Sequence, residues 1–166
     1  MRCACLLSVA AVALFAGCAG PAPYTYHYKP GKTASLHDGY ATAPPAAPTQ
    51  VHATIAAGNR IVGLPYVRGG GHETGGASAF DCSGAASYVL QAAGQLRSSM
   101  PSRGFRRYGQ RGEGKWMSIY ARRDHVFLVV AGLRFDTGWT DTLGGPQWTT
   151  RSRPTRGCVI RHPAGL

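Results

Sequence analysis

Three residues of the sequence, Cys82, His125 and Asp136, belong to types that together perform nucleophilic catalysis. A cysteine thiolate attacks a carbonyl carbon, a histidine moves the proton, and a carboxylate orients the imidazole. Asp81 is a typical helix N-cap, so we expect Cys82 in the first turn of a helix. The helix dipole and the unpaired N–H groups there lower the pKa of a thiol. The carboxylate of Asp81 opposes this effect, so a stable thiolate also needs a nearby imidazolium.

His125 and Asp136 can approach each other across a predicted β-hairpin. If residues 131–132 form its two-residue turn, the residues on either side of the turn pair with each other. Asp136 is then a diagonal neighbour of His125 on the same face of the two strands. One hairpin can therefore present to Cys82 both a base and the carboxylate that orients it.

Each of these residues also has a purely structural explanation. Only Cys82 and Cys158 lie in the body of the chain, and two cysteines in an oxidising compartment can form a disulfide. A histidine at the start of a strand is commonly a surface residue, and an aspartate at the end of one is commonly a turn residue. On spacing alone, the catalytic and the structural explanations both stay open.

The elements that would position these residues indicate an α+β fold. Helix is predicted over residues 50–62 and, most clearly, over Cys82–Ala93, where small and apolar residues recur at three- and four-residue steps before a capping Gly94. Beyond this point the pattern becomes that of strands. The predicted strands are Trp116–Ala121, His125–Ala131, Leu133–Asp136 and Cys158–His162. Helices followed by antiparallel strands are typical of an α+β domain, and the Val-rich second strand should lie inside the sheet.

The N-terminal residues are typical of an export signal. Arg2 precedes the apolar run Leu6–Phe15, which is too short to span a bilayer as a helix. Two small residues and Cys18 follow, and this arrangement resembles a bacterial lipoprotein signal, which is cleaved before a cysteine that receives the lipid. An ordinary signal peptide that is cleaved elsewhere is the alternative.

These features divide the chain into three parts. We expect residues 1–17 to be a lipoprotein signal peptide, residues 18–48 a Pro- and Ala-rich tether, and residues 49–166 the single folded domain. The residue after the lipidated cysteine is Ala19, and in a Gram-negative cell this implies sorting to the outer membrane. The expected location is therefore the periplasmic side of the cell envelope, where a lipid on Cys18 would anchor the protein to the membrane.

Charge favours an anionic partner. The 18 lysines and arginines outnumber the 7 acidic residues, and the formal net charge is +11. An exported protein rarely meets nucleic acid, and no aromatic-and-basic recognition motif is present, so we expect an anionic envelope surface instead; a basic face that only aids solubility stays open. No Cys-x-x-Cys or His-Glu-x-x-His spacing occurs, and we expect neither a metal nor a cofactor.

Three segments resemble the NlpC-type family of cell-wall cysteine peptidases. They are Pro65–Gly70 with the sequence PYVRGG, Phe80–Gly84 with FDCSG, and His125–Val130 with HVFLVV. The resemblance covers roughly residues 49–166. It implies a papain-like α+β fold in which the helix that begins with the nucleophile packs on a small antiparallel sheet.

The resemblance also assigns roles. Cys82 matches the nucleophile and His125 the general base, and Asp136 stands where the family has a third polar residue that orients the base. Tyr66 matches a tyrosine near the cysteine whose hydroxyl helps to stabilise the oxyanion. The implied reaction is hydrolysis of an amide bond in a peptidoglycan stem peptide, commonly the D-glutamyl–diaminopimelate link, by a monomeric enzyme.

Three further residues, Asp81, Ser83 and His72, are candidates for binding the substrate or the oxyanion, because they flank the nucleophile or lie in the preceding Gly-rich loop. For His72, a solvent-exposed loop histidine without such a role is an equal alternative. The chain departs from the family at residues 112–117, where a Pro-Gly-Asp-Leu turn is usual, which indicates a divergent branch. Two alternatives therefore remain. One is a non-catalytic envelope lipoprotein that binds wall polymer or a partner protein, and the other is a structural lipoprotein with a Cys82–Cys158 disulfide.

Overall fold

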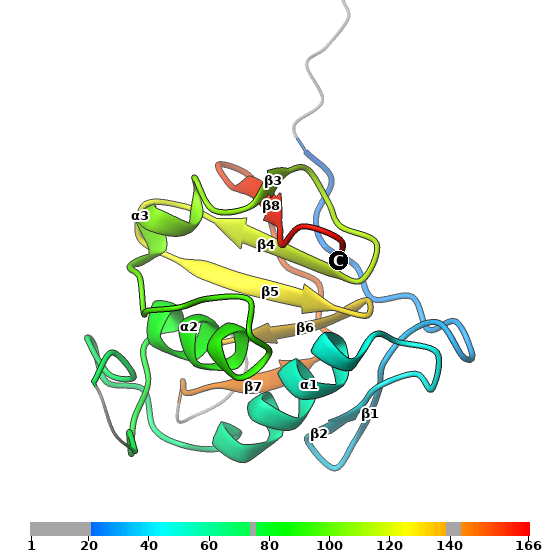
Figure 1. Ribbon diagram of the computed structural model, residues 1–166, viewed down its shortest axis with the longest axis horizontal. Coiled ribbons are helices and arrows are strands. Elements are labelled where there is room, and N and C mark those ends of the chain that lie inside the picture. Colours follow the sequence, from blue (N-terminus) through cyan, green and yellow to red (C-terminus); the bar gives the residue numbers. More distant parts are fainter. Residues whose placement is uncertain (1–20, 74–75, 139–143) are drawn as a thin grey trace, which may run out of the picture.

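The computed structural model describes residues 21–73, 76–138 and 144–166, which form an α+β domain (Figure 1). Two helices lie on one face of a six-stranded antiparallel sheet with the order β3-β8-β4-β5-β6-β7. These two helices are α1 (Thr49–Ile61) and α2 (Cys82–Ala92), and a short third helix, α3 (Ser102–Phe105), follows α2. The sheet strands are β3 (Gln110–Arg111), β4 (Met117–Ala121), β5 (Val126–Val130), β6 (Leu133–Asp136), β7 (Gln147–Thr149) and β8 (Val159–His162). A separate hairpin consists of β1 (Ser35–His37) and β2 (Tyr40–Thr42).

The predicted α+β class is confirmed, and the long periodic segments formed the expected elements. The two predicted helices are α1 and α2, and the four predicted strands are β4, β5, β6 and β8. Strand β5 lies between β4 and β6, as its Val-rich sequence indicated. Hairpin β1-β2, strands β3 and β7, and helix α3 had not been predicted.

The hairpin between β5 and β6 has the predicted register. Val130 pairs with Leu133, and the two turn residues, Ala131 and Gly132, both have positive φ angles, 45° and 78°. Positive φ at both central positions defines the type I′ turn, whose twist matches that of the flanking strands. The backbone oxygen of Ala131 accepts a hydrogen bond from the backbone N–H of Ala34 at 2.8 Å, which ties the turn to the N-terminal segment.

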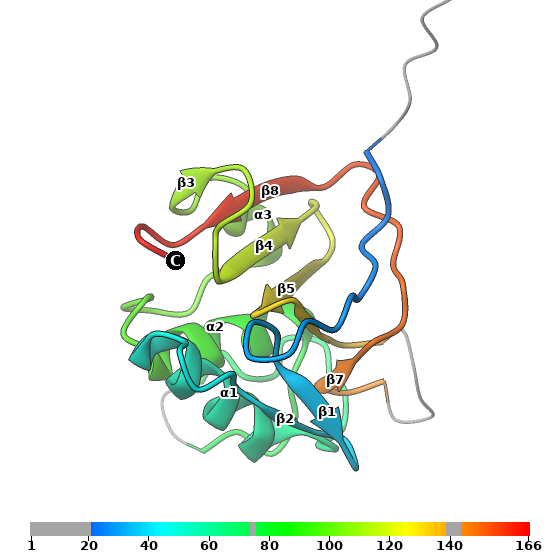
Figure 2. The ribbon, with the colours of Figure 1, turned by 90° about the vertical axis from the view of Figure 1, so that its right-hand side faces the viewer.

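The N-terminal segment differs from the expected tether. From residue 21 onward it packs on the domain, because its apolar side chains find buried positions between the prolines: Tyr24, Ala34 and Ala41 are all buried. Tyr24 also pairs through its backbone with Arg153, and Figure 2 shows the segment beside the chain that follows β7. The predicted signal peptide and Cys18 lie outside the described residues. Within the described ranges, no helix is long and apolar enough to cross a membrane.

The core lies between the sheet and the two long helices. Val89 and Leu90 of α2, and Ile119 and Leu128 of the central strands, are fully buried. Burial of each such side chain stabilises the fold by about 1.5–3 kcal/mol, relative to the same side chain exposed to water. This packing fixes α2 on the sheet, and with it the position of the residue that begins the helix.

Candidate active site

The structure brings Cys82, His125 and Asp136 together at one end of the sheet. Cys82 is the first residue of α2, His125 directly precedes β5, and Asp136 is the last residue of β6. The Nε2 atom of His125 lies 2.8 Å from Oδ1 of Asp136, so a proton on Nε2 is donated to the carboxylate. Nδ1 is therefore the ring nitrogen left to face Cys82, the thiol whose pKa His125 lowers.

The surroundings favour a charged pair of Cys82 and His125. Burial of Cys82, which is 7% exposed, would raise the pKa of its thiol. Hydrogen bonds from His125 and Ser102, together with the charge of His125, outweigh burial and lower the pKa. Burial likewise opposes protonation of His125, but its hydrogen bonds to Asp136 and Cys82 raise its pKa above the ordinary value. Both shifts favour the thiolate–imidazolium form.

Ser102 is a contact of the thiol that the sequence did not reveal. Its hydroxyl oxygen lies 3.3 Å from the Cys82 sulfur, and the residue is buried at the start of α3. The backbone oxygen of Asp124 lies 4.0 Å from the same sulfur. Helix α3 has four residues, too few to show a helical period, and only Pro101 before it signals a helix start.

Two arginines hold the far side of the Asp136 carboxylate. Arg153 donates from Nη1 to Oδ2 at 2.6 Å, and Nε of Arg134 lies 3.3 Å from the same oxygen. The backbone N–H of Thr137 donates to Oδ1 at 2.8 Å, the oxygen that also faces His125. The carboxylate is buried and has partners on both oxygens, so its orientation toward His125 is fixed. Neither arginine was expected at the site, although Arg134 lies on the same strand face as Asp136.

Asp81, Ser83 and His72 form a second polar cluster beside the thiol. Asp81 caps α2 by accepting the backbone N–H of Gly84 at 2.7 Å, and it also accepts the Ser83 hydroxyl at 2.9 Å. His72 Nε2 lies 3.1 Å from both Asp81 Oδ1 and the Ser83 oxygen, and the N–H of Gly69 donates to Asp81 Oδ2 at 2.9 Å. Burial opposes ionisation of Asp81, but these hydrogen bonds outweigh it and lower its pKa. The three residues thus bind one another and hold the Gly-rich loop on the helix.

Close backbone contact between this loop and α2 explains one glycine of the motif. A Cβ atom at Gly84 would lie 2.0 Å from the backbone oxygen of Gly70, which no side chain could tolerate without movement. The same oxygen of Gly70 accepts the N–H of Asp81 at 3.0 Å. Gly84 therefore allows the loop to reach the first turn of the helix, where Cys82 lies.

Tyr66 lies on the exposed side of the site. It is 42% exposed, and its backbone pairs with Phe80, two residues before the cysteine. Partial burial raises the pKa of its hydroxyl, and the negative charges of Cys82 and Asp81 raise it further. Tyr66 is therefore a neutral hydroxyl near the sulfur that can donate a hydrogen bond.

Comparison with known proteins finds no matching family model and no curated protein or solved structure with significant similarity.

The site contains the three groups that nucleophilic catalysis by a thiol requires. The thiol has a base, the base has an orienting carboxylate, and Cys82 and Cys158 are both free, so the alternative disulfide between them is not formed. Within the described ranges, no group of three or more His, Cys, Asp or Glu residues could hold a metal ion. The arrangement can form and then hydrolyse a thioester.

Proposed function

We propose that the protein is an exported cysteine hydrolase that cleaves an amide bond in peptidoglycan stem peptides, with the D-glutamyl–diaminopimelate bond as the expected target. The observation that carries the proposal is the hydrogen bond between the imidazole of His125 and the buried carboxylate of Asp136, beside a helix N-terminal thiol whose pKa His125 lowers. The helix-on-sheet arrangement supports a papain-like fold. The motifs around Tyr66, Cys82 and His125 supply the choice of substrate.

The steps of the proposed reaction follow from the charges of the two groups, a Cys82 thiolate and a protonated His125. The Cys82 thiolate attacks the amide carbonyl carbon, and Tyr66 donates a hydrogen bond to the oxyanion. Protonated His125 then gives its proton to the leaving amine as the C–N bond breaks, which yields a thioester. Water attacks the thioester, His125 accepts a proton from this water, and the carboxylic acid leaves as the thiolate is restored. Asp136 keeps the imidazole in position throughout.

The same proposal places the protein in the cell envelope. A lipid on Cys18 would anchor it to the outer membrane on the periplasmic side, where peptidoglycan is within reach. The fold of residues 21–48 onto the domain leaves few residues between the anchor and the domain surface. The enzyme would therefore act close to the membrane.

Digestion of purified peptidoglycan, followed by mass analysis of the released fragments, tests the proposal. We expect fragments from cleavage within the stem peptide with the native protein, and none with Cys82→Ala or His125→Ala. Cys158→Ala is the matched control, because Cys158 is the other free cysteine among the described residues and has no role in the proposed reaction. Appreciable turnover by Cys82→Ala would disprove the proposed nucleophile.

The low exposure of Cys82 favours a second candidate, a non-catalytic lipoprotein that binds wall polymer or a partner protein. In that case the native protein would sediment with peptidoglycan but release no fragments. Cys82→Ala would then bind the wall material as strongly as the native protein does.

A further inference from the structure

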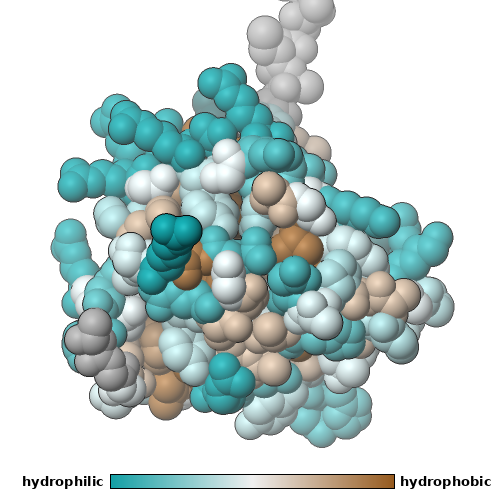
Figure 3. All heavy atoms as spheres, viewed as in Figure 1, coloured by the Kyte–Doolittle hydropathy of each residue, from teal (hydrophilic) through white to brown (hydrophobic). Residues whose placement is uncertain are grey.

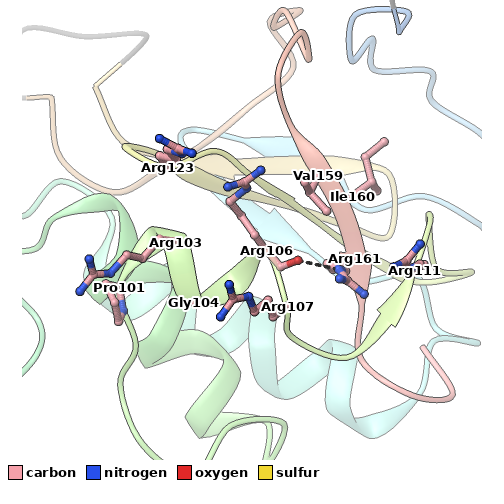
Figure 4. A pocket seen from close by; sticks show the side chains of 10 residues that line it. All are labelled: Pro101, Arg103, Gly104, Arg106, Arg107, Arg111, Arg123, Val159, Ile160 and Arg161. Atoms are coloured by element: carbon pink, nitrogen blue, oxygen red, sulfur yellow. Dashed lines mark hydrogen bonds between the residues drawn. The ribbon is translucent and has the colours of Figure 1, made fainter.

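Six arginines line one cavity of about 1030 Å³ between α3 and the edge of the sheet (Figure 4). They come from α3 and the residues after it, from β3 and β8, and from the turn between β4 and β5. They are Arg103, Arg106, Arg107, Arg111, Arg123 and Arg161. No acidic side chain is among the residues that line the cavity.

The charge of this arginine cavity is not neutralised by the protein. Within the described parts of the chain, none of the six arginines forms an ion pair. Arg161 Nε donates to the backbone oxygen of Arg106 at 2.9 Å, and Arg106 Nε is buried without a hydrogen-bond partner among the described residues. Like charges gathered in one concave site repel one another and create a strongly positive potential. An anionic ligand would relieve both the repulsion and the missing hydrogen bond.

The arginine cavity adjoins the thiol site. Pro101 and Arg103 line it, and the residue between them is Ser102, whose hydroxyl contacts the Cys82 sulfur. Arg123 also lines it, and the next residue is Asp124, whose backbone oxygen lies near the same sulfur. Two chain segments thus border both the cavity and the thiol site, although Cys82 itself does not line the cavity.

We propose that the arginine cavity binds a soluble chain that carries several phosphate groups. The planar guanidinium group forms paired hydrogen bonds with phosphate oxygens, and six such groups require more negative charge than one carboxylate supplies. No aromatic side chain lines the cavity, so the stacking platform typical of single-stranded nucleic acid sites is missing. This binding does not depend on Cys82 being a nucleophile.

A membrane headgroup fits the arginine cavity less well than a soluble chain. Of the described residues, the exposed large hydrophobic ones are Tyr28, Tyr40, Tyr66 and Val67, and none of them lines the cavity. Figure 3 shows hydrophilic side chains over the corner of the molecule that contains α3. The site thus lacks the apolar residues that would enter a bilayer beside bound headgroups.

Calorimetric titration with inorganic tripolyphosphate tests the proposal on the purified protein. We expect the double variant Arg103→Gln/Arg107→Gln to weaken binding of tripolyphosphate at least about tenfold, because each replaced guanidinium group loses its charge-assisted hydrogen bonds to phosphate. Arg103 and Arg107 are both solvent-exposed, so their replacement should not affect folding. Arg97→Gln/Arg156→Gln is the matched control, with the same loss of charge at exposed positions that do not line the cavity.

Three further ligands complete the test. Citrate supplies carboxylates, vesicles of phosphatidylglycerol supply headgroups, and a short single-stranded DNA supplies phosphodiesters with bases. Tripolyphosphate binding that is stronger than citrate binding, and that only the cavity variant weakens, supports the proposal. Equal binding by the cavity and control variants would overturn it, and so would binding to vesicles or DNA without binding to tripolyphosphate.

Discussion

Asp136 and Arg134 are both buried and charged, yet their replacement should have very unequal effects on stability. Asp136 is 3% exposed and is the shared anion for Arg134, Arg153 and His125. In Asp136→Asn, two buried guanidinium groups lose their counter-charge while the shape of the site is kept. Removing one partner of a buried ion pair costs about 3–5 kcal/mol. That loss is a large part of the total stability of a domain, about 5–15 kcal/mol.

Arg134 is a poorly paired charge by comparison. Its side chain is 0% exposed, and none of its three guanidinium nitrogens has a hydrogen-bond partner among the described residues. Among the described residues its one ion-pair partner is Asp136, and the rings of Tyr24 and Phe127 lie 5.8 Å and 6.0 Å from its guanidinium carbon. Burial is the main reason why its pKa is lowered. Because Arg153 still pairs with Asp136 when an apolar residue of similar volume replaces Arg134, the carboxylate keeps a counter-charge, and Arg134→Met should cost less than the roughly 3–5 kcal/mol expected for an uncompensated buried charge.

Urea denaturation with linear extrapolation measures both effects as changes in the free energy of unfolding. Asp124→Asn is the matched control for Asp136→Asn, because the Asp124 side chain is 81% exposed and its Arg122 contact, at 3.7 Å, should contribute at most about 1 kcal/mol. A loss below about 1 kcal/mol in Asp136→Asn would refute the reasoning. A loss above about 3 kcal/mol in Arg134→Met would refute it as well, because Arg134 would then be well paired.

Other predictions concern the thiol and the loop beside it. An ordinary thiol is about 3% thiolate at pH 7, so the lowered pKa of Cys82 should speed iodoacetamide labelling by at most about thirtyfold. In the native protein, labelling of Cys82 should stay fast as the pH falls below about 8.5, the ordinary pKa of a thiol. In His125→Ala, Cys82 should label at the rate of an ordinary thiol, and the same dependence of rate on pH in both proteins would contradict the charged pair. Ser102→Ala should move the labelling profile to higher pH by less than His125→Ala does, and an unchanged profile would remove the hydroxyl from the site. Gly84→Ala should destabilise the fold by about 1–3 kcal/mol in urea, because its Cβ would meet a backbone oxygen, whereas Gly76→Ala, with open space around it, is the control.

The sequence predicted the parts of the site that depend on local pattern. Helix α2 follows from an N-cap and regular apolar spacing, and the register of β5 and β6 follows from a two-residue turn. Both rules act within about fifteen residues, and they sufficed to place His125 and Asp136 on one face. The convergence of that hairpin with α2 depends on packing between distant elements, which the spacing of residues does not encode.

The contacts that the sequence did not predict come from segments without a period. Strand β7 has three residues and α3 has four, so neither shows a pattern, although α3 carries Ser102 to the thiol. Arg153 lies outside the predicted elements, and its contact with Asp136 depends on the path of the chain after β7. Charge composition indicated an anionic partner, but only the fold collects six of the arginines around one cavity.

The N-terminal segment links the domain boundary to the orienting carboxylate. Tyr24 and Arg153 exchange two backbone hydrogen bonds, at 2.9 Å and 3.1 Å, and the Tyr24 ring lies beside Arg134. These are the two arginines that hold Asp136, and Tyr24 is also bonded through its hydroxyl to the backbone oxygen of Gly132 in the β5-β6 turn. A segment whose prolines suggested a tether thus covers the ion pairs behind the site and excludes water from them. Because burial strengthens the charge interactions that orient His125, the residues from 21 onward are part of the folded domain, which does not start at Thr49.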